Sequence, residues 1–248
     1  MLKILKAELS DPRMLKTCMD IISNMIDEAN LVATEEGLHL RAMDPAHVAL
    51  VELSLQKEVF DTYELEAEEV KLGLDLGRLS SVLKRAGAGD RLVLLADEGE
   101  LKITFEGIST RAFRMTLIEV SGEDVALPGL DFPATAEIEP ETFGEAVRDA
   151  MVVGDNVALR AEEERLCISA GGGLGEVEIE IPRENTYYFK SAGEVESTFG
   201  LEYLKDMIKA KDIAKVLRIH IGRDMPAKLE YLGDGVEMKF LLAPRVER

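Results

Sequence analysis

The apolar and polar positions in the first half of the chain predict two amphipathic helices separated by strands. Apolar residues recur at helical spacing after Ser10-Asp11-Pro12, a sequence typical of a helix start. A second helix is predicted from about Asp75 to Ala86, where Ala86-Gly87-Ala88-Gly89 ends it. Alternating apolar and polar residues predict strands over 31–55 and in the later segments RLVLLA, LKITFEG and TRAFRMTLI.

The second half of the chain repeats this order of elements. A helix opening at Pro140 precedes the strand patterns VALRAE, RLCISA and EVEIEI, and a helix over 201–208 precedes KVLRIHIG, AKLEYL and VEMKFLLAP. Leu79, Val82, Leu83 and Lys84 match Leu204, Met207, Ile208 and Lys209 at an offset of 125 residues. Such self-similarity indicates an internal duplication. The predicted fold class is therefore α+β, with two similar domains of antiparallel sheet and two helices each.

Strand alternation stops between the two copies. The segment 118–133 contains Ser121-Gly122, Pro128-Gly129 and Phe132-Pro133, which break helices and strands alike. It also carries six apolar residues of the kind that a purely solvated linker lacks, namely Ile118, Val120, Val125, Leu127, Leu130 and Phe132. We predict domains at 1–117 and 134–248 joined by a connector at 118–133 that lies against other parts of the protein.

Two strand patterns leave their pairing open. Val177, Ile179 and Ile181 share one face of a strand whose other face carries Glu176, Glu178 and Glu180, and a Gly-rich segment precedes it. This strand and TRAFRMTLI are candidates for edge strands that pair with another chain. Alternatively, each pairs only within its own domain, which the pattern taken alone favours.

The net charge of −19 argues against nucleic acid as a partner of the whole surface. Its distribution changes that conclusion. The four predicted helices carry a net charge of +1, which leaves −20 for the remaining chain. If all four helices lie on one face of the protein, that face tolerates a polyanion. The charge distribution taken alone favours the simpler interpretation, which is that the helices have ordinary solvated surfaces.

Catalytic and metal-binding patterns are weak. The glycines of 171–175 are followed by a strand, which indicates a hairpin and not a phosphate-binding loop. The histidines His39, His47 and His220 and the cysteines Cys18 and Cys167 lack metal-ligand spacing. The sequence shows neither a signal-peptide pattern nor a membrane-spanning apolar run. We expect a cytoplasmic protein that is not an enzyme and has no cofactor and no metal.

Four stretches together resemble the proliferating cell nuclear antigen family, the sliding clamps of archaea and eukaryotes. They are LHLRAMDPAHVALVELSL, Leu127-Pro128 in the connector, Met225-Pro226 before a strand, and LAPRVE from Leu242 to Glu247. The resemblance covers essentially the full length. It implies a homotrimeric ring whose helices surround duplex DNA, with DNA polymerase, clamp loader, flap endonuclease and DNA ligase as partners. It also implies association with the nucleoid, or a nuclear location in a eukaryote.

Two alternatives to a homotrimeric clamp remain. One is a clamp-fold subunit of a heteromeric or checkpoint-type ring, and the other is an enzyme of duplicated α+β fold that binds metals on its acidic surface.

The resemblance also implies three sets of site residues. The channel residues, expected to contact DNA phosphates, are Arg13, Lys16, Arg78, Lys84, Arg85, Arg148, Lys205, Lys209 and Lys211. The client surface, expected to bind partner peptides, comprises Met43, His47, Val48, Leu50, Val125, Leu127, Pro128, Pro226, Leu241, Ala243 and Pro244. The subunit interface comprises Thr110, Arg111, Phe113, Arg114 and Met115 with Val177, Glu178, Ile179, Glu180 and Ile181. Ser23, Ser81, Val152 and Glu202 stand where other members often carry a basic residue, which implies a weaker grip on DNA.

Overall fold

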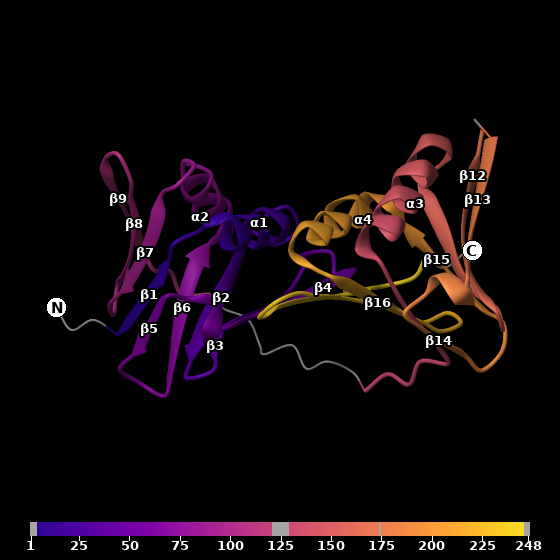
Figure 1. The fold of residues 1–248 in the computed structure, drawn as a ribbon, viewed down its shortest axis with the longest axis horizontal. Helices are drawn as coiled ribbons and strands as arrows, with labels where there is room; N and C mark the ends of the chain where they lie inside the picture. Colours follow the sequence, from indigo (N-terminus) through magenta and orange to yellow (C-terminus); the bar gives the residue numbers. More distant parts are fainter. Residues whose placement is uncertain (1–3, 121–128, 174, 246–248) are drawn as a thin grey trace. The chain divides into compact units, whose positions relative to one another are not determined.

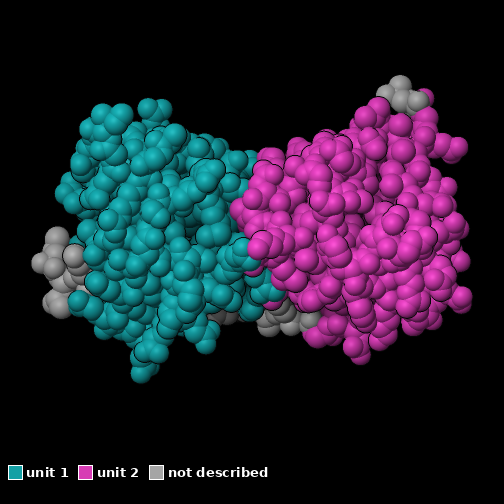
Figure 2. All heavy atoms as spheres, in the orientation of Figure 1, with its two compact units in different colours: residues 1–43, 51–125, 234–237 teal, residues 44–50, 126–233, 238–248 magenta. Residues whose placement is uncertain are grey.

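A computed structural model describes residues 4–120, 129–173 and 175–245 (Figure 1). The chain divides into two compact units (Figure 2). Unit 1 comprises residues 1–43, 51–125 and 234–237, and unit 2 comprises residues 44–50, 126–233 and 238–248. The predicted domain boundaries at 117 and 134 stay a prediction.

The first copy of the repeat holds nine strands and two α-helices. In chain order they are β1 (Leu5–Leu9), α1 (Arg13–Ile22), β2 (Glu28–Thr34), β3 (Gly37–Met43), β4 (Ala49–Gln56), the 3-10 helix η1 (Lys57–Val59), β5 (Thr62–Leu65), β6 (Glu69–Asp75), α2 (Leu76–Leu83), β7 (Arg91–Ala96), β8 (Glu100–Glu106) and β9 (Thr110–Thr116). One sheet has the order β5-β1-β7-β8-β9, and β3, β2 and β6 pair in a second. The strands pair antiparallel in both sets.

The second copy holds the same series with one additional 3-10 helix, η3. It consists of β10 (Ala134–Ile138), α3 (Pro140–Val153), β11 (Asn156–Ala161), β12 (Arg165–Gly172), β13 (Gly175–Pro182), η2 (Arg183–Asn185), β14 (Tyr188–Ser191), β15 (Val195–Gly200), α4 (Leu201–Met207), η3 (Ile208–Ile213), β16 (Val216–Ile221), β17 (Ala227–Leu232) and β18 (Val236–Leu242). Strands β13-β12-β11-β15 form one sheet, and β14-β10-β16-β17 are consecutive neighbours in another. The predicted duplication and α+β class are confirmed.

The sequence explains where the helices begin and end. Asp75 caps α2 by accepting the Arg78 N–H at 2.7 Å, and Pro140 stands in the first turn of α3, where its missing N–H costs no hydrogen bond. Each helix buries one apolar face, which for α1 includes Leu15, Cys18 and Met19. In each copy the two helices pack against each other. None of the helices in the described parts of the chain combines the length and apolarity needed to cross a bilayer.

Strands β4 and β18 are each divided between the two units. Within unit 1, the Gln56 N–H donates to the Gly235 carbonyl oxygen at 2.8 Å. Within unit 2, the Ala243 N–H donates to the Val48 carbonyl oxygen at 2.8 Å. Since the residue numbers run in opposite directions, these two bonds have the register of an antiparallel strand pair.

Candidate functional site

The predicted channel residues of unit 1 all lie on its two helices or directly after them. Arg13 is paired with Asp11 at 2.6 Å, and Lys84 is paired with Asp20. The other three, Lys16, Arg78 and Arg85, make no ion pair with any described residue. Unit 1 therefore presents three uncompensated cations from its helix layer.

In unit 2 most of the predicted channel residues are already bound to carboxylates. Arg148 contacts Glu141 at 2.6 Å and Glu145 at 2.5 Å, while the Lys211 ammonium lies 2.6 Å from Glu141. Lys211 and Arg148 together lower the pKa of Glu141, with Lys211 the larger cause. The remaining two differ, because Lys209 is held by Asp206 at 2.6 Å whereas Lys205 has no carboxylate partner in the described chain.

The two candidate edge strands are confirmed as sheet edges within the described chain. Strand β9 ends the five-stranded order and pairs with β8, and β13 ends the four-stranded order and pairs with β12. Phe113 and Met115 of β9 lie opposite Ile103 and Leu101 of β8. An edge strand keeps a row of main-chain donors and acceptors available for another strand.

Four of the five charged side chains on the two edge strands have partners among the described residues, and Glu176 is the exception. Arg111 pairs with Asp90 and lies over the Phe105 ring at 5.4 Å, and Arg114 pairs with Glu100 at 3.1 Å. On β13, Glu178 pairs with Arg160 at 2.8 Å and Glu180 with Arg165 at 3.0 Å. Side-chain attraction between two copies would therefore exchange existing ion pairs and add little, which leaves main-chain bonds and apolar contact as the main forces.

The structure brings Cys167 close to Glu178 and Glu180, with one ligand atom from each lying within 4.8 Å of the others. Both glutamates are paired with arginines, and burial raises the pKa of the Cys167 thiol. Metal binding needs a thiolate and free carboxylates. This cluster fits the pairing of β12 with β13 and not a cation site.

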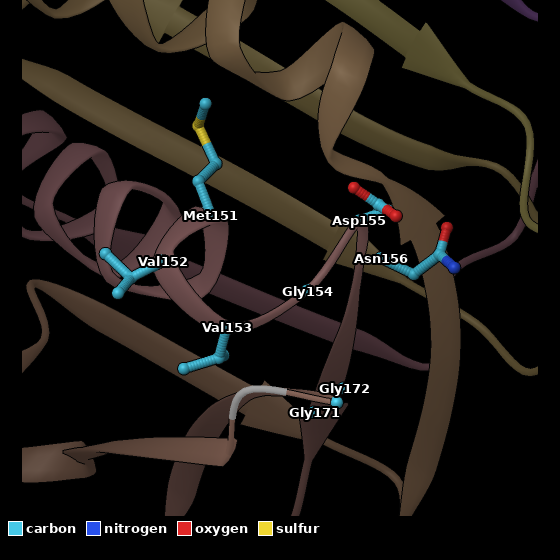
Figure 3. A pocket seen from close by; sticks show the side chains of 9 residues that line it. Met151, Val152, Val153, Gly154, Asp155, Asn156, Gly171 and Gly172 are labelled. Atoms are coloured by element: carbon cyan, nitrogen blue, oxygen red, sulfur yellow. The ribbon is translucent and has the colours of Figure 1, made fainter.

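A hollow of about 380 Å³ lies between the C-terminal end of α3 and the β12–β13 hairpin (Figure 3). Its lining combines Met151, Val152 and Val153 with the backbone of Gly154, Gly171, Gly172 and Gly173 and with Asp155 and Asn156. Val152 is 70% exposed. The described lining carries one titratable side chain, Asp155, so the hollow offers no pair of groups for acid–base chemistry.

The predicted client surface is only partly described. Val125, Leu127 and Pro128 lie outside the described residues. In unit 2, the main chain of Val48 is bound to Ala243 and Pro244 follows directly, so these three residues lie together. His47 is exposed, Pro226 and Leu241 are half-buried, and Leu50 is only 3% exposed, so the Leu50 side chain offers a ligand almost no surface. Met43 belongs to unit 1.

The turn that carries His47 and Val48 is organised by Asp44, a residue to which the sequence analysis assigned no role. The Asp44 side chain is 4% exposed and accepts the N–H groups of Ala46, Val48 and Ala49 at 3.1, 2.7 and 2.6 Å. These three bonds close the segment into a compact turn.

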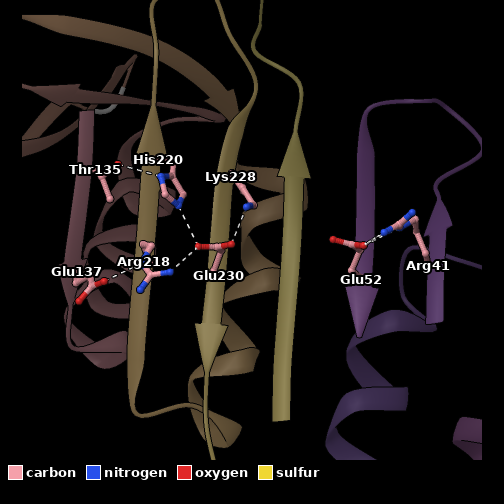
Figure 4. A network of polar contacts seen from close by, with 8 residues as sticks. All are labelled: Arg41, Glu52, Thr135, Glu137, Arg218, His220, Lys228 and Glu230. Carbon is pink, nitrogen blue, oxygen red and sulfur yellow. Dashed lines mark hydrogen bonds and ion pairs between the residues drawn. The ribbon is translucent and has the colours of Figure 1, made fainter. Parts of the chain in front are cut away.

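Two of the three histidines take part in side-chain contacts within the sheets. His39 contacts Ser54 at 3.3 Å, and His220 lies between Thr135 at 2.9 Å and Glu230 at 3.0 Å (Figure 4). Glu230 also receives the Lys228 ammonium at 2.6 Å. Burial alone would raise the pKa of Glu230, but hydrogen bonds from His220 and Lys228 outweigh it and hold that pKa far below its usual range.

Comparison with known families matches both halves of the chain. Residues 4–123 match the model of the proliferating cell nuclear antigen N-terminal domain, and residues 126–245 match that of its C-terminal domain.

Individual relatives agree with the family match. A DNA polymerase sliding clamp of Methanococcus vannielii is 36% identical and covers 94% of this chain and 95% of the relative, and one of Thermococcus onnurineus is 41% identical over 91% and 92%. The crystal structure of a Thermococcus kodakaraensis proliferating cell nuclear antigen superposes with a TM-score of 0.89 at 29% identity, covering 97% of this chain and all of that one.

Proposed function

Because the chain belongs to the proliferating cell nuclear antigen family, we propose that it is a DNA polymerase sliding clamp that closes as a ring of three copies around duplex DNA. The clamp binds and does not catalyse. Its mechanism is topological, since a closed ring converts weak contacts with phosphates into long residence on the duplex. Contacts of this kind go to the DNA backbone and carry no sequence information, which permits sliding.

The observation that carries the ring proposal is the pairing state of equivalent strands. Strands β4 and β13 occupy the same place in the two copies, each eight residues long and followed by a three-residue 3-10 helix. Strands β9 and β18 likewise each end their copy. Segments of β4 and β18 have antiparallel hydrogen bonds within each unit, whereas β9 and β13 are edges. Pairing β9 of one subunit with β13 of the next subunit repeats this arrangement head to tail between chains. A rotation between successive subunits then closes the ring.

The duplication also supplies a register for this closing contact. We match β13 to β4 by their ends, and the core-facing Phe113 and Met115 of β9 to Met238 and Phe240 of β18. The register then sets Phe113 opposite Ile179 and Met115 opposite Val177, apolar against apolar. On the other strand face Arg114 lies opposite Glu178, and Ala112 lies opposite Glu180 with its N–H directed across the junction. The exposed Met151 and Val152 beside the β12–β13 hairpin add apolar surface near the same edge.

In the proposed ring the helices of both units face the DNA, and the uncompensated Lys16, Arg78, Arg85 and Lys205 contribute most of the attraction. The connector at 118–133 and the client surface dock short peptides from DNA polymerase, clamp loader, flap endonuclease and DNA ligase. A peptide with one helical turn and apolar anchors suits a surface that combines Val48, Leu241 and Pro244. Such a ring acts on the chromosome, at the nucleoid or in the nucleus.

Ring closure is tested by placing proline at the outward N–H of the edge strand. Ala112 is exposed, so Ala112→Pro removes one main-chain donor from each junction without filling the core. Light scattering should give the wild-type protein about three times its chain mass of 27.4 kDa and the variant the mass of a single chain. Ala112→Ser keeps the N–H and should remain a trimer.

Circular dichroism checks that the Ala112→Pro monomer stays folded. A wild-type mass of one chain at all protein concentrations would contradict the homotrimer and favour a clamp-fold subunit of a heteromeric ring. A trimeric Ala112→Pro variant would contradict the β9–β13 contact.

A further inference from the structure

The carboxylate of Asp44 has a fourth partner besides the three N–H groups of its own turn. The Tyr203 hydroxyl donates to Asp44 Oδ2 at 2.9 Å, and both residues belong to unit 2. Tyr203 stands in the first turn of α4, so this bond attaches the turn to a helix 159 residues away in the sequence. Oδ1 accepts two N–H groups and Oδ2 one N–H and the hydroxyl, which uses the acceptor capacity of a buried carboxylate.

The turn contains a backbone conformation that needs such support. His47 has a φ of 57°, in the left-handed region that residues other than glycine rarely adopt. Its N–H donates to the Asp44 carbonyl oxygen at 2.9 Å. A residue in this region keeps one conformation only where its surroundings fix the chain, and the Asp44 hydrogen bonds are the contacts that fix it here.

The electrostatics of the pair agree with this geometry. Burial would raise the pKa of Asp44, but the N–H groups and the Tyr203 hydroxyl outweigh it and lower that pKa, which keeps the carboxylate charged. Burial and the neighbouring Asp44 raise the pKa of Tyr203 to about 12, which keeps its hydroxyl a donor. A hydroxyl that donates to a charged carboxylate makes one of the stronger hydrogen bonds in proteins.

The equivalent positions elsewhere in the duplicated fold lack this bond. At the offset that matches Leu79 to Leu204, the counterpart of Tyr203 is Arg78, whose side chain makes no ion pair with the described residues. The hairpin equivalent to the Asp44 turn joins β12 to β13 and contains Gly171, Gly172 and Gly173. The duplicated fold therefore has this bond at one of two equivalent places and lacks it at the other, so the fold itself does not require it.

We infer that Tyr203 is a positioning residue of the client surface: through Asp44 its hydroxyl fixes the turn that presents His47 and Val48 to a partner peptide. The inference rests on the proposed function, because it assigns the turn to client binding. It adds a residue outside the client surface and a physical reason for its effect. A turn that is fixed before binding loses less conformational entropy when the peptide docks.

Tyr203→Phe removes the hydroxyl and keeps the ring. The probe is a short fluorescein-labelled peptide with one helical turn that carries a leucine and two phenylalanines, and its affinity for the intact ring is measured by fluorescence anisotropy. We expect binding to weaken roughly three- to tenfold, because only part of the free energy of the lost hydrogen bond affects the contact between the turn and the peptide. Amide hydrogen exchange at Ala46, Val48 and Ala49 should accelerate, while amides in β16 and β17 keep their rates.

The matched control is Tyr188→Phe, because Tyr188 lies in the same unit, is 47% exposed and has no hydroxyl hydrogen bond among the described residues. It should leave affinity and exchange unchanged. Asp44→Asn should weaken binding as well, and adding Tyr203→Phe to it should cause little further loss, because both substitutions break the same bond.

The outcomes separate this inference from the proposed function. If the wild-type trimer does not bind the peptide, the client surface is misassigned and the inference falls with it. If the wild type binds and Tyr203→Phe binds equally well, or if exchange accelerates throughout unit 2, the positioning role is wrong while the client surface stands.

Discussion

The helix layers of the two copies differ in charge although their folds correspond. Helices α1 and α2 carry three basic residues and one acidic residue, whereas α3, α4 and η3 carry four basic and six acidic residues. Of the predicted channel residues, Lys16, Arg78 and Arg85 in unit 1 are uncompensated by described carboxylates, but in unit 2 the same holds for Lys205 alone.

Because of this difference, counting the basic residues on the helices overestimates their attraction to a polyanion. A cation that is already paired must lose its carboxylate partner before it contacts a phosphate, so its net contribution is small. In the proposed ring the first copy then provides most of the DNA contact and the second little. Such weak and uneven contact suits a clamp that must slide, because ring closure and not binding strength keeps it on DNA.

The largest expected effect is on the salt dependence of DNA binding. Arg78→Gln removes one uncompensated cation from each subunit and therefore three from each ring. The slope of the logarithm of the DNA-binding constant against the logarithm of the salt concentration should then fall by up to about 3. Lys211→Gln should reduce it less, because Glu141 already holds Lys211 at 2.6 Å. Fluorescence anisotropy with a labelled duplex, over a range of low salt concentrations, measures both slopes.

Glu141→Gln sharpens the same comparison, since it weakens the hold on Lys211 and Arg148 and should tighten DNA binding. Equal slopes for Arg78→Gln and Lys211→Gln, with no gain for Glu141→Gln, would show that the ion pairs of unit 2 do not restrain its cations.

A smaller effect is expected from a second difference, on the sheets. Glu230 of β17, 5% exposed, corresponds to Thr104 of β8, 7% exposed. Glu230→Gln leaves Lys228 and Arg218 without their shared carboxylate and should reduce the free energy of unfolding by about 1–3 kcal/mol. The matched control Thr104→Val, at a position without a described side-chain hydrogen bond, should change it by less than about 0.5 kcal/mol. Urea titration followed by circular dichroism measures both.

The pH dependence of the Glu230 effect follows from the direction of its pKa shift. The folded state lowers this pKa, so the stabilisation is fully present above the unfolded value of about 4.3 and is lost as pH falls towards the folded value. The difference between wild type and Glu230→Gln should therefore shrink in acid. A difference that grows as the pH falls would refute the ion-pair explanation.

The duplication and the four helices could be predicted because each leaves a local or periodic signal in the sequence. The pairing of the channel residues could not. Glu141 and Lys211 are 70 residues apart, and only the packing of α3 against η3 brings them together. The role of Asp44 was missed for the same reason, because its decisive partner, Tyr203, lies on a distant helix. The candidate edge strands remained ambiguous because alternation predicts a strand but not its number of neighbours.

The most direct test of the clamp is whether its hold on DNA depends on the topology of the DNA. The protein is loaded by a clamp loader and ATP onto a nicked circular plasmid, and the bound fraction is then separated by gel filtration in high salt. We predict that the ring stays on the circle and is released when a restriction enzyme cuts the plasmid, because it slides off the ends. Retention on the linear DNA, or no retention on the circle, would contradict the account.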